Sequence, residues 1–194
     1  MSVINPIAVF QDCYEKAKLV HEDEEYNAIS LATVDAQGVP SVRIVLLKYF
    51  DERGFVFFTN KNSQKAQDIR VNPNVSGCFY WPKLEIQIRL QGMAEEISEQ
   101  ESDQYFATRI RERQIGAWAS LQSTRLESDA VLEARVEKFT KQFEGQTIPR
   151  PQYWGGYKIV PTVVEIWQKR GHRLNKRDFY EKQGNTWQHC LLYP

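Results

Sequence analysis

Two charged side chains stand within a segment of the chain that otherwise reads as an apolar β-strand. Arg43 and Lys48 enclose four aliphatic residues. On a regular strand these two positions point to opposite faces, unless a bulge intervenes. Gln87 similarly interrupts an apolar strand, between Ile86 and Ile88. Each case has an ordinary alternative, because cations at strand ends can reach solvent and Gln87 can face water by alternation.

A second group of polar residues follows a helix start. Ser98 and Glu101 form a capping-box pattern, which predicts a helix that carries Tyr105 and Arg109 on one face, four residues apart. That spacing suits the binding of an anion such as a phosphate. Farther along, Trp118 precedes the polar run 120–125, which is either a helix end that binds an anion or a surface loop.

Familiar catalytic patterns are missing from the sequence. It contains no glycine-rich phosphate loop, no G-x-S-x-G and no H-E-x-x-H. Neither the histidines nor the cysteines have the spacing of a metal site or a disulfide framework: His21, His172, His189, Cys13, Cys78 and Cys190. We therefore expect no metal, and we expect that an enzyme built on this chain uses a bound organic cofactor.

Composition narrows the class of protein. The chain has 194 residues, 42% of them hydrophobic, and its 25 basic and 25 acidic residues give a net charge of zero. A neutral chain offers no long-range attraction for nucleic acid, and no apolar run is long enough to cross a bilayer. The N-terminus lacks the pattern of a secretory signal, so we expect a cytoplasmic protein with no nucleic-acid or membrane partner. Charge is unevenly placed: acidic residues crowd 21–25 and 95–103, and basic residues crowd 109–113 and 169–177.

Most of the chain reads as strands joined by short turns. Asn5 and Pro6 predict the start of a first helix. Strands are expected over 28–34, 41–50, 55–59, 75–81, 85–95, 158–167, 179–181 and 187–191, and further helices over 63–71, from 98 onward and over 127–143. Because the first strands are joined by tight turns, the pattern predicts a mainly β protein, an antiparallel barrel with peripheral helices.

A series of short motifs, in order along nearly the whole chain, resembles the pyridoxine (pyridoxamine) 5′-phosphate oxidase family. The matching segments are Arg43-Ile-Val-Leu-Leu-Lys48, Phe57-Phe-Thr-Asn60, Ser63-Gln-Lys-Ala66, Gln114-Ile-Gly-Ala-Trp118 with Gln122-Ser123, Tyr153-Trp-Gly-Gly156, and Glu165-Ile-Trp-Gln168 with Arg173, Leu174 and Arg177. The resemblance implies a Greek-key-like split β-barrel that forms a homodimer, with flavin mononucleotide (FMN) at the subunit interface. It also implies a single domain over 1–194, whose dimerisation segment from about 150 to 194 packs on the same barrel.

The resemblance assigns FMN contacts to residues spread along the chain. Arg43 and Lys65 would lie near the FMN phosphate, Gln87 at the ring edge, and Gln122 and Ser123 would reach across the dimer. The full set is Arg43, Ile44, Val45, Leu46, Leu47, Lys48, Phe58, Thr59, Lys65, Gln87, Gln122, Ser123, Trp167 and Arg177.

The same resemblance implies the substrate and the reaction. Lys48, Tyr105 and Arg109 would bind the 5′-phosphate of a pyridine substrate, and Arg173 would lie over its ring as the catalytic residue. The reaction would oxidise pyridoxine 5′-phosphate or pyridoxamine 5′-phosphate to pyridoxal 5′-phosphate, with O₂ as acceptor and H₂O₂ as product.

Four features depart from the family pattern. Asn175 stands where a histidine is usual, Gln64 replaces an arginine near the FMN phosphate, and Arg113 replaces a small hydroxyl residue near the substrate phosphate. Arg113 could add a cation there or crowd the pocket. The chain also begins close to its first helix, without the longer basic arm of many members. These departures leave two alternatives open, a related FMN oxidase acting on a phenazine precursor and a low-activity protein that binds FMN or pyridoxal phosphate.

Overall fold

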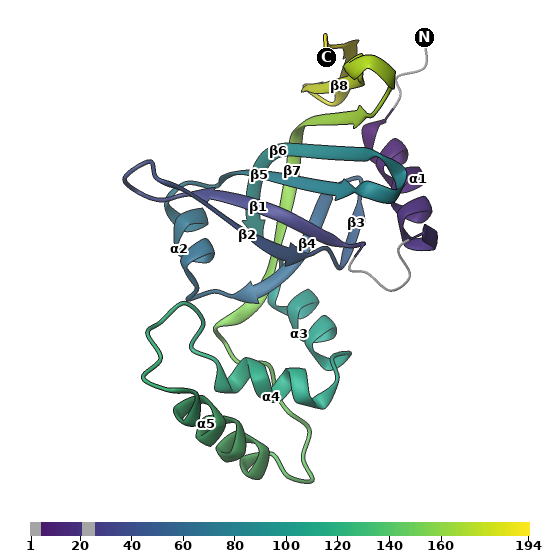
Figure 1. Cartoon of the computed structure of the whole chain (residues 1–194). Coiled ribbons are helices and arrows are strands. Elements are labelled where there is room, and N and C mark those ends of the chain that lie inside the picture. Colours follow the sequence, from purple (N-terminus) through teal and green to yellow (C-terminus); the bar gives the residue numbers. More distant parts are fainter. Residues whose placement is uncertain (1–4, 21–25) are drawn as a thin grey trace.

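The computed structural model describes residues 5–20 and 26–194, and the acidic segment 21–25 lies outside them. Its strands form one antiparallel sheet in the order β2-β1-β5-β6-β7-β4-β3, with β8 pairing with β7 and β9 with β8 (Figure 1). The bounds are β1 Ala28–Val34, β2 Pro40–Leu46, β3 Tyr49–Asp51, β4 Gly54–Asn60, β5 Asn74–Trp81, β6 Ile86–Glu96, β7 Trp154–Gln168, β8 Lys176–Gln183 and β9 Thr186–Leu191. The predicted fold class, an antiparallel β-barrel with helices around it, is confirmed, and the sheet curls into a half-barrel.

The sheet turns a corner between β2 and β3. Residues of β2 pair with β1 as far as Leu46, which lies opposite Ala28. The Leu47 amide then donates to Asn27 O, whereas the Lys48 amide donates to Val56 O of β4. The chain thus moves from one neighbouring strand to another within two residues. The single strand predicted over 41–50 is therefore wrong, and it is two strands on either side of this corner.

β7 is the longest strand and lies between β6 and β4 while also pairing with β8. Its ladder with β6 shifts register at Gln91 and Gly92. A Cβ on Gly92 would lie 2.1 Å from Val160 O, so only glycine allows this approach. Because β7 joins strands from both ends of the chain, the segment after residue 150 shares one sheet with the rest.

The barrel interior is aromatic and is closed at one end by α1, Pro6–Val20. The Ile7 amide donates to the Asn5 side chain at 3.0 Å, as expected of a capping residue. Phe10 is fully buried and meets Phe50 and Phe55 edge to face, with centroids 4.9 and 4.8 Å away. The helix predicted from Asn5 and Pro6 is confirmed, and its apolar face is part of the main core.

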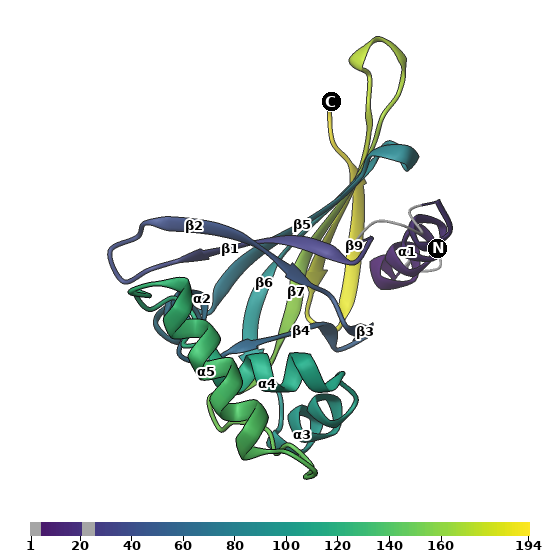
Figure 2. The same ribbon diagram turned by 60° about the horizontal axis from the view of Figure 1, so that its bottom comes forward.

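The remaining helices are α2 Gln64–Val71, α3 Glu99–Ala107, α4 Arg111–Ala119 and α5 Asp129–Gln142. Figures 1 and 2 show α3, α4 and α5 gathered together, apart from α1. They enclose a second apolar cluster of Phe106, Ile115, Phe143, Ile148 and Trp154. No helix in the ranges 5–20 and 26–194 is long and apolar enough to cross a membrane.

No bounds were predicted for α4, although a helix end near Trp118 was one of two interpretations of that segment. Its N-cap is Ile110, which offers no side-chain cap, and Gly116 lies within it. The helix is held from outside instead, since the Arg111 guanidinium donates to Phe143 O and Gln146 O at 2.5 and 3.0 Å. Tertiary contacts therefore supply what the local sequence lacks.

Candidate functional site

A cavity of about 780 Å³ lies between the β2–β4 side of the sheet and helices α3 and α4. It brings together ten of the residues that the sequence predicted for binding: Ile44, Val45, Leu46, Lys48, Phe58, Thr59, Lys65, Tyr105, Arg109 and Gln122. Lys48, Lys65, Arg109 and Arg113 are cations on its wall, and Glu112 is the one carboxylate among its lining residues. The cavity is therefore suited to anionic ligands.

One wall carries a compact polar cluster around Lys65, on the first turn of α2. Its ammonium donates to Thr59 Oγ1 at 3.1 Å, Ser63 Oγ at 3.2 Å and Gln122 Oε1 at 3.2 Å. Burial lowers the pKa of Lys65 to about 8, and the nearby Arg43 cation adds to this effect. A buried ammonium held only by neutral oxygens still has electrostatic capacity for an anion.

Gln122 reaches this cluster from the loop after α4, within its own chain. The Thr59 hydroxyl donates to Gln122 Oε1 at 3.0 Å. The sequence interpretation placed Gln122 across a dimer, whereas here it already lies beside Lys65 of the same subunit. Ser123 does not line the cavity and is exposed, with φ of 71°. Of the two interpretations of the run 120–125, the structure agrees with the loop: the run follows the C-terminal end of α4, where the helix dipole is negative.

Arg43 lies behind the cavity wall rather than on it. Its guanidinium donates to Thr33 Oγ1 at 2.5 Å and lies 3.7 Å from the buried Asp68 carboxylate. Gln64 donates to the other Asp68 oxygen at 2.8 Å. Asp68 and Thr33 were missed by sequence reasoning, since nothing in the sequence marks them as partners of Arg43.

Tyr105 and Arg109 lie on the opposite wall of the cavity. The stacked rings of Phe58, Tyr105 and Trp154 form an aromatic platform there. The Tyr105 ring stacks on Phe58 with centroids 4.0 Å apart, and the Arg109 guanidinium lies 4.6 Å from the centre of the Trp154 ring. One buried guanidinium nitrogen of Arg109, Nη1, has no hydrogen-bond partner within the described ranges. Burial lowers the pKa of Arg109, because removing the guanidinium from water destabilises its charged form.

The predicted helical pairing of Tyr105 and Arg109 is corrected in one respect. The capping box at Ser98 and Glu101 is present, but the helix ends at Ala107. Arg109 lies in the turn before α4, where its amide donates to Phe106 O at 3.2 Å. The two side chains converge because this turn redirects the chain, rather than because they share a helix face.

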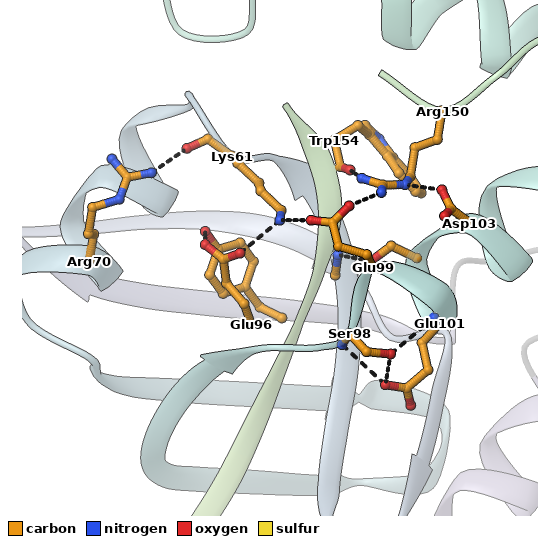
Figure 3. Close-up of polar contacts among 12 residues, drawn as sticks. Lys61, Arg70, Glu96, Ser98, Glu99, Glu101, Asp103, Arg150 and Trp154 are labelled. Atoms are coloured by element: carbon orange, nitrogen blue, oxygen red, sulfur yellow. Dashed lines mark hydrogen bonds and ion pairs between the residues drawn. The ribbon is translucent and has the colours of Figure 1, made fainter. Parts of the chain in front are cut away.

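An ion-pair network outside the cavity fixes the aromatic platform. The Glu99 carboxylate, on the first turn of α3, binds both Lys61 and Arg150 (Figure 3). Arg150 also pairs with Asp103 at 2.6 Å and donates to Trp154 O at 2.5 Å. This network ties α3 to β7 at Trp154, the residue beneath Arg109. Trp154 was not among the predicted site residues, although it belongs to one of the matching motifs.

Three predicted residues form a separate row on the sheet. Gln87 lies opposite Trp167 in the β6–β7 ladder, and Trp167 lies opposite Arg177 in the β7–β8 ladder. All three are half-buried and on one face. Arg177 is held by the buried Glu165 carboxylate at 2.7 Å. None of these residues lines the cavity, and Leu47, another predicted contact, is buried in the core.

Arg173 lies on a strained loop between β7 and β8. His172 and Arg173 have φ of 57° and 60°, which is unfavourable for residues with a Cβ. The Asn175 side-chain oxygen accepts the Arg170 amide at 3.1 Å, and the Leu174 amide donates to Gly171 O at 3.2 Å. This loop lies at the end of the molecule away from α3 and α4 in Figures 1 and 2. One subunit therefore does not bring Arg173 to the cavity.

Comparison with known proteins gives consistent results over the whole chain. Residues 16–143 match the family model described as pyridoxamine 5′-phosphate oxidase, and residues 154–194 match the pyridoxine 5′-phosphate oxidase C-terminal dimerisation region. A pyridoxine/pyridoxamine 5′-phosphate oxidase from Nostoc punctiforme is 47% identical over 192 residues, which cover 98% of this chain and 89% of that protein. One from Rubrobacter xylanophilus is 48% identical over 190 residues, covering 98% and 87%.

A solved structure is also similar to this chain. PhzG from Burkholderia lata, in complex with tetrahydrophenazine-1-carboxylic acid, superposes with a TM-score of 0.92 at 29% identity and covers 98% of this chain and 93% of its own. An FMN-binding protein related to pyridoxamine 5′-phosphate oxidase, from Nostoc punctiforme, gives 0.78 at 19% identity with full coverage of both chains. The second likeness supports the fold alone.

Proposed function

The chain belongs to the pyridoxamine 5′-phosphate oxidase family, and on that premise we propose that it is an FMN-dependent oxidase of phosphorylated B6 compounds. Pyridoxine 5′-phosphate and O₂ would give pyridoxal 5′-phosphate and H₂O₂. Pyridoxamine 5′-phosphate would require water as well and would release ammonia. Its curated relatives of 47 and 48% identity carry this activity in their names.

The residues on the wall around Lys65 fit the phosphate of FMN. A phosphate carries up to two negative charges at neutral pH and accepts several hydrogen bonds. Lys65 offers a buried ammonium, and Arg43 lies behind it at the Asp68 carboxylate. When bound, FMN would accept two electrons and a proton from the substrate carbon and would be reoxidised by O₂. Residues Ile44 to Lys48, at the end of β2 and in the corner after it, and the Phe58–Thr59 pair would then lie along the cofactor.

The single observation that carries the proposal is the unpaired Arg109 guanidinium nitrogen. A buried cationic donor without a partner is costly, and a phosphate oxygen would satisfy it with a charge-assisted bond. Lys48 and Tyr105 line the same cavity. The stack of Trp154, Tyr105 and Phe58 restricts where Arg109 can move, so that the substrate phosphate is held in a fixed place.

We further propose a homodimer in which the two parts of the site meet. The family's dimerisation region covers 154–194, which includes Trp167, Arg173 and Arg177. The row of Gln87, Trp167 and Arg177 and the Arg173 loop lie off the cavity in one subunit, so a partner subunit would supply them. Segment 150–194 and the rest would form one domain, since β7 pairs with strands from both. Dilution that separates subunits should release FMN in parallel, and FMN retained by a proven monomer would contradict this arrangement.

A cytoplasmic location is also part of the proposal. All three cysteines lie in the described ranges and are free thiols, of which Cys13 is buried and Cys190 exposed. Disulfides persist in oxidising compartments and are rare in the cytosol.

The proposal is tested by turnover in air, following pyridoxal 5′-phosphate and H₂O₂. We expect sustained product formation from the FMN-loaded protein. Arg109→Gln should lower kcat/KM for either substrate by about 10- to 100-fold, as expected for the loss of a charge-assisted bond to a phosphate. FMN binding should be unchanged in this variant. A flavin-loaded protein that forms no product from either substrate would refute the oxidase assignment.

A second candidate substrate is a phenazine precursor, which the PhzG likeness favours. Its carboxylate could also pair with Arg109, but it has no phosphate to use Lys48 and Tyr105 as well. If the protein turned over tetrahydrophenazine-1-carboxylic acid but neither pyridoxine 5′-phosphate nor pyridoxamine 5′-phosphate, this second function would be favoured over the first.

A further inference from the structure

Arg150 is the residue at which the ion-pair network of Figure 3 meets the aromatic platform. It lies in the segment before β7, and it is not among the described residues that line the cavity. Its guanidinium uses all three nitrogens: Nε pairs with Asp103 at 2.6 Å, Nη2 pairs with Glu99, and Nη1 donates to Trp154 O at 2.5 Å. These three contacts hold the Arg150 side chain in one orientation, behind the platform.

The three partners of Arg150 belong to the two elements that build the platform. Glu99 and Asp103 lie four residues apart on α3, which also carries Tyr105 and Phe106. Trp154 begins β7, and its ring centroid lies 6.3 Å from that of Tyr105 and 5.1 Å from that of Phe106. A single guanidinium therefore joins the strand that supplies Trp154 to the helix that supplies its ring partners.

The position of Arg109 depends on the rings beneath it. Its guanidinium lies 4.6 Å from the centre of the Trp154 ring and 5.6 Å from the centre of the Phe106 ring. One of its buried nitrogens, Nη1, has no hydrogen-bond partner in the ranges 5–20 and 26–194. Contacts between a cation and a ring are weaker and less directional than charge-assisted hydrogen bonds. A shift of Trp154 against α3 would therefore move Arg109 with it.

The ordinary alternative is that Arg150 only stabilises the fold through ion pairs at the surface. Its carboxylate partners Glu99 and Asp103 are 66% and 61% exposed, and exposed ion pairs contribute little to the free energy of unfolding. The Arg150 side chain itself is only 6% exposed. Burying a cation is unfavourable unless its donors are satisfied, so surface ion pairs alone do not account for its place beside Trp154.

We propose that Arg150 is a positioning residue for Arg109. By holding Trp154 against α3, it sets the place at which the Arg109 guanidinium meets an anionic ligand in the cavity. A misplaced Arg109 binds that ligand more weakly, because a hydrogen bond weakens steeply as its distance and angle depart from the optimum. The identity of the ligand, a phosphorylated B6 compound, rests on the proposed function.

The test is a double-mutant cycle on the affinity of the FMN-loaded protein for pyridoxal 5′-phosphate, measured by equilibrium dialysis. Arg150→Gln should weaken binding by about 5- to 10-fold on its own, and by less than about twofold when Arg109→Gln is also present. Arg150→Lys keeps the charge but cannot make three bonds in a fixed plane, so it should weaken binding nearly as much as Arg150→Gln. Lys61→Gln removes the other cation bound to Glu99 and leaves the bond to Trp154 in place, so it should bind as the wild type does.

Equal losses from Arg150→Gln with and without Arg109→Gln would overturn the proposal, because Arg150 would then act independently of Arg109. Wild-type affinity in either Arg150 variant, whatever its melting temperature, would also overturn it and would leave Arg150 a role in stability alone. If Arg150→Gln does not fold, Asp103→Asn removes one of the three contacts and should give a smaller loss that again requires Arg109. Because binding is measured without turnover, a protein inactive as an oxidase could still show this coupling, and the two proposals can fail separately.

Discussion

If Lys65 binds the FMN phosphate as proposed, its depressed pKa should make the affinity for FMN depend on pH above neutrality. Lys65 is 7% exposed, and burial, with a smaller contribution from Arg43, lowers its pKa to about 8. Below pH 8 the ammonium is charged and can pair with the FMN phosphate. Above pH 8 the flavin-free protein loses this charge, and binding must restore a proton to it. The phosphate itself stays dianionic, because its second pKa is about 6.

The size of the effect follows from the fraction of Lys65 that remains protonated. At pH 9 about one tenth of the side chains carry the proton, so the dissociation constant should rise about tenfold, or about 1.4 kcal/mol. The affinity for FMN should continue to fall until the pH reaches the pKa of Lys65 in the complex, which is higher because the bound phosphate stabilises the ammonium. Quenching of flavin fluorescence, measured from pH 7 to 9.5 on flavin-stripped protein, gives this curve directly.

Two variants and one ligand separate Lys65 from other groups that titrate. Lys65→Arg keeps its charge throughout this range, so its affinity should be flat with pH. Lys65→Met should be flat as well, but weaker than the wild type at pH 7. Riboflavin, which has no phosphate, should show no such fall with the wild-type protein. A wild-type curve that stays flat to pH 9.5, or an equal fall in Lys65→Arg, would refute the reasoning.

Two further predictions concern the departures from the family pattern. Asn175→Ala removes the acceptor of the Arg170 amide and should relax the loop of Arg173, lowering turnover by up to about tenfold. Asn175→Asp keeps an acceptor oxygen and should retain activity, and equal turnover in Asn175→Ala and wild type would show that this bond does not position the loop. Gln64→Arg adds a cation beside the proposed site of the FMN phosphate and should tighten FMN binding by about 3- to 10-fold, although it gives up the hydrogen bond from the Gln64 amide to Asp68. Riboflavin, which has no phosphate, serves as the control ligand. An equal increase in riboflavin affinity in Gln64→Arg would contradict an attraction between the new cation and the FMN phosphate.

Much of the sheet could be predicted because its strands carry their own signal. β1 begins and ends at the predicted residues, and the buried residues of β6 alternate with polar ones as expected. The capping box at Ser98 marks the start of α3 correctly. In each case the information is local, residing in side-chain alternation or in a capping box of four residues.

What could not be predicted depends on contacts between distant parts of the chain. The corner at Leu47 and Lys48 exists because β4 takes over from β1 as the hydrogen-bonding partner, and no residue in 41–50 signals it. α4 is stabilised by the hydrogen bond from Arg111 to Phe143 O at the end of α5. The sequence around the N-terminus of α4 does not predict this contact. Asp68 and Trp154 support site residues from behind, and their types alone do not distinguish them from ordinary core residues.

The positions of the predicted site residues in one subunit indicate which parts of the site would need a second subunit. Lys65 and Arg109, the cations proposed to bind the two phosphates, both line a cavity formed by residues of a single chain, with their supporting contacts in place. Arg173 and Arg177 lie on or beside β8, away from that cavity. The contacts proposed for the phosphates therefore come from one subunit, whereas holding the flavin and orienting the reacting ring would need the partner, so separated subunits should still release FMN. On this reasoning, a variant that separates the subunits should lose turnover more completely than it loses affinity for a free phosphate ligand.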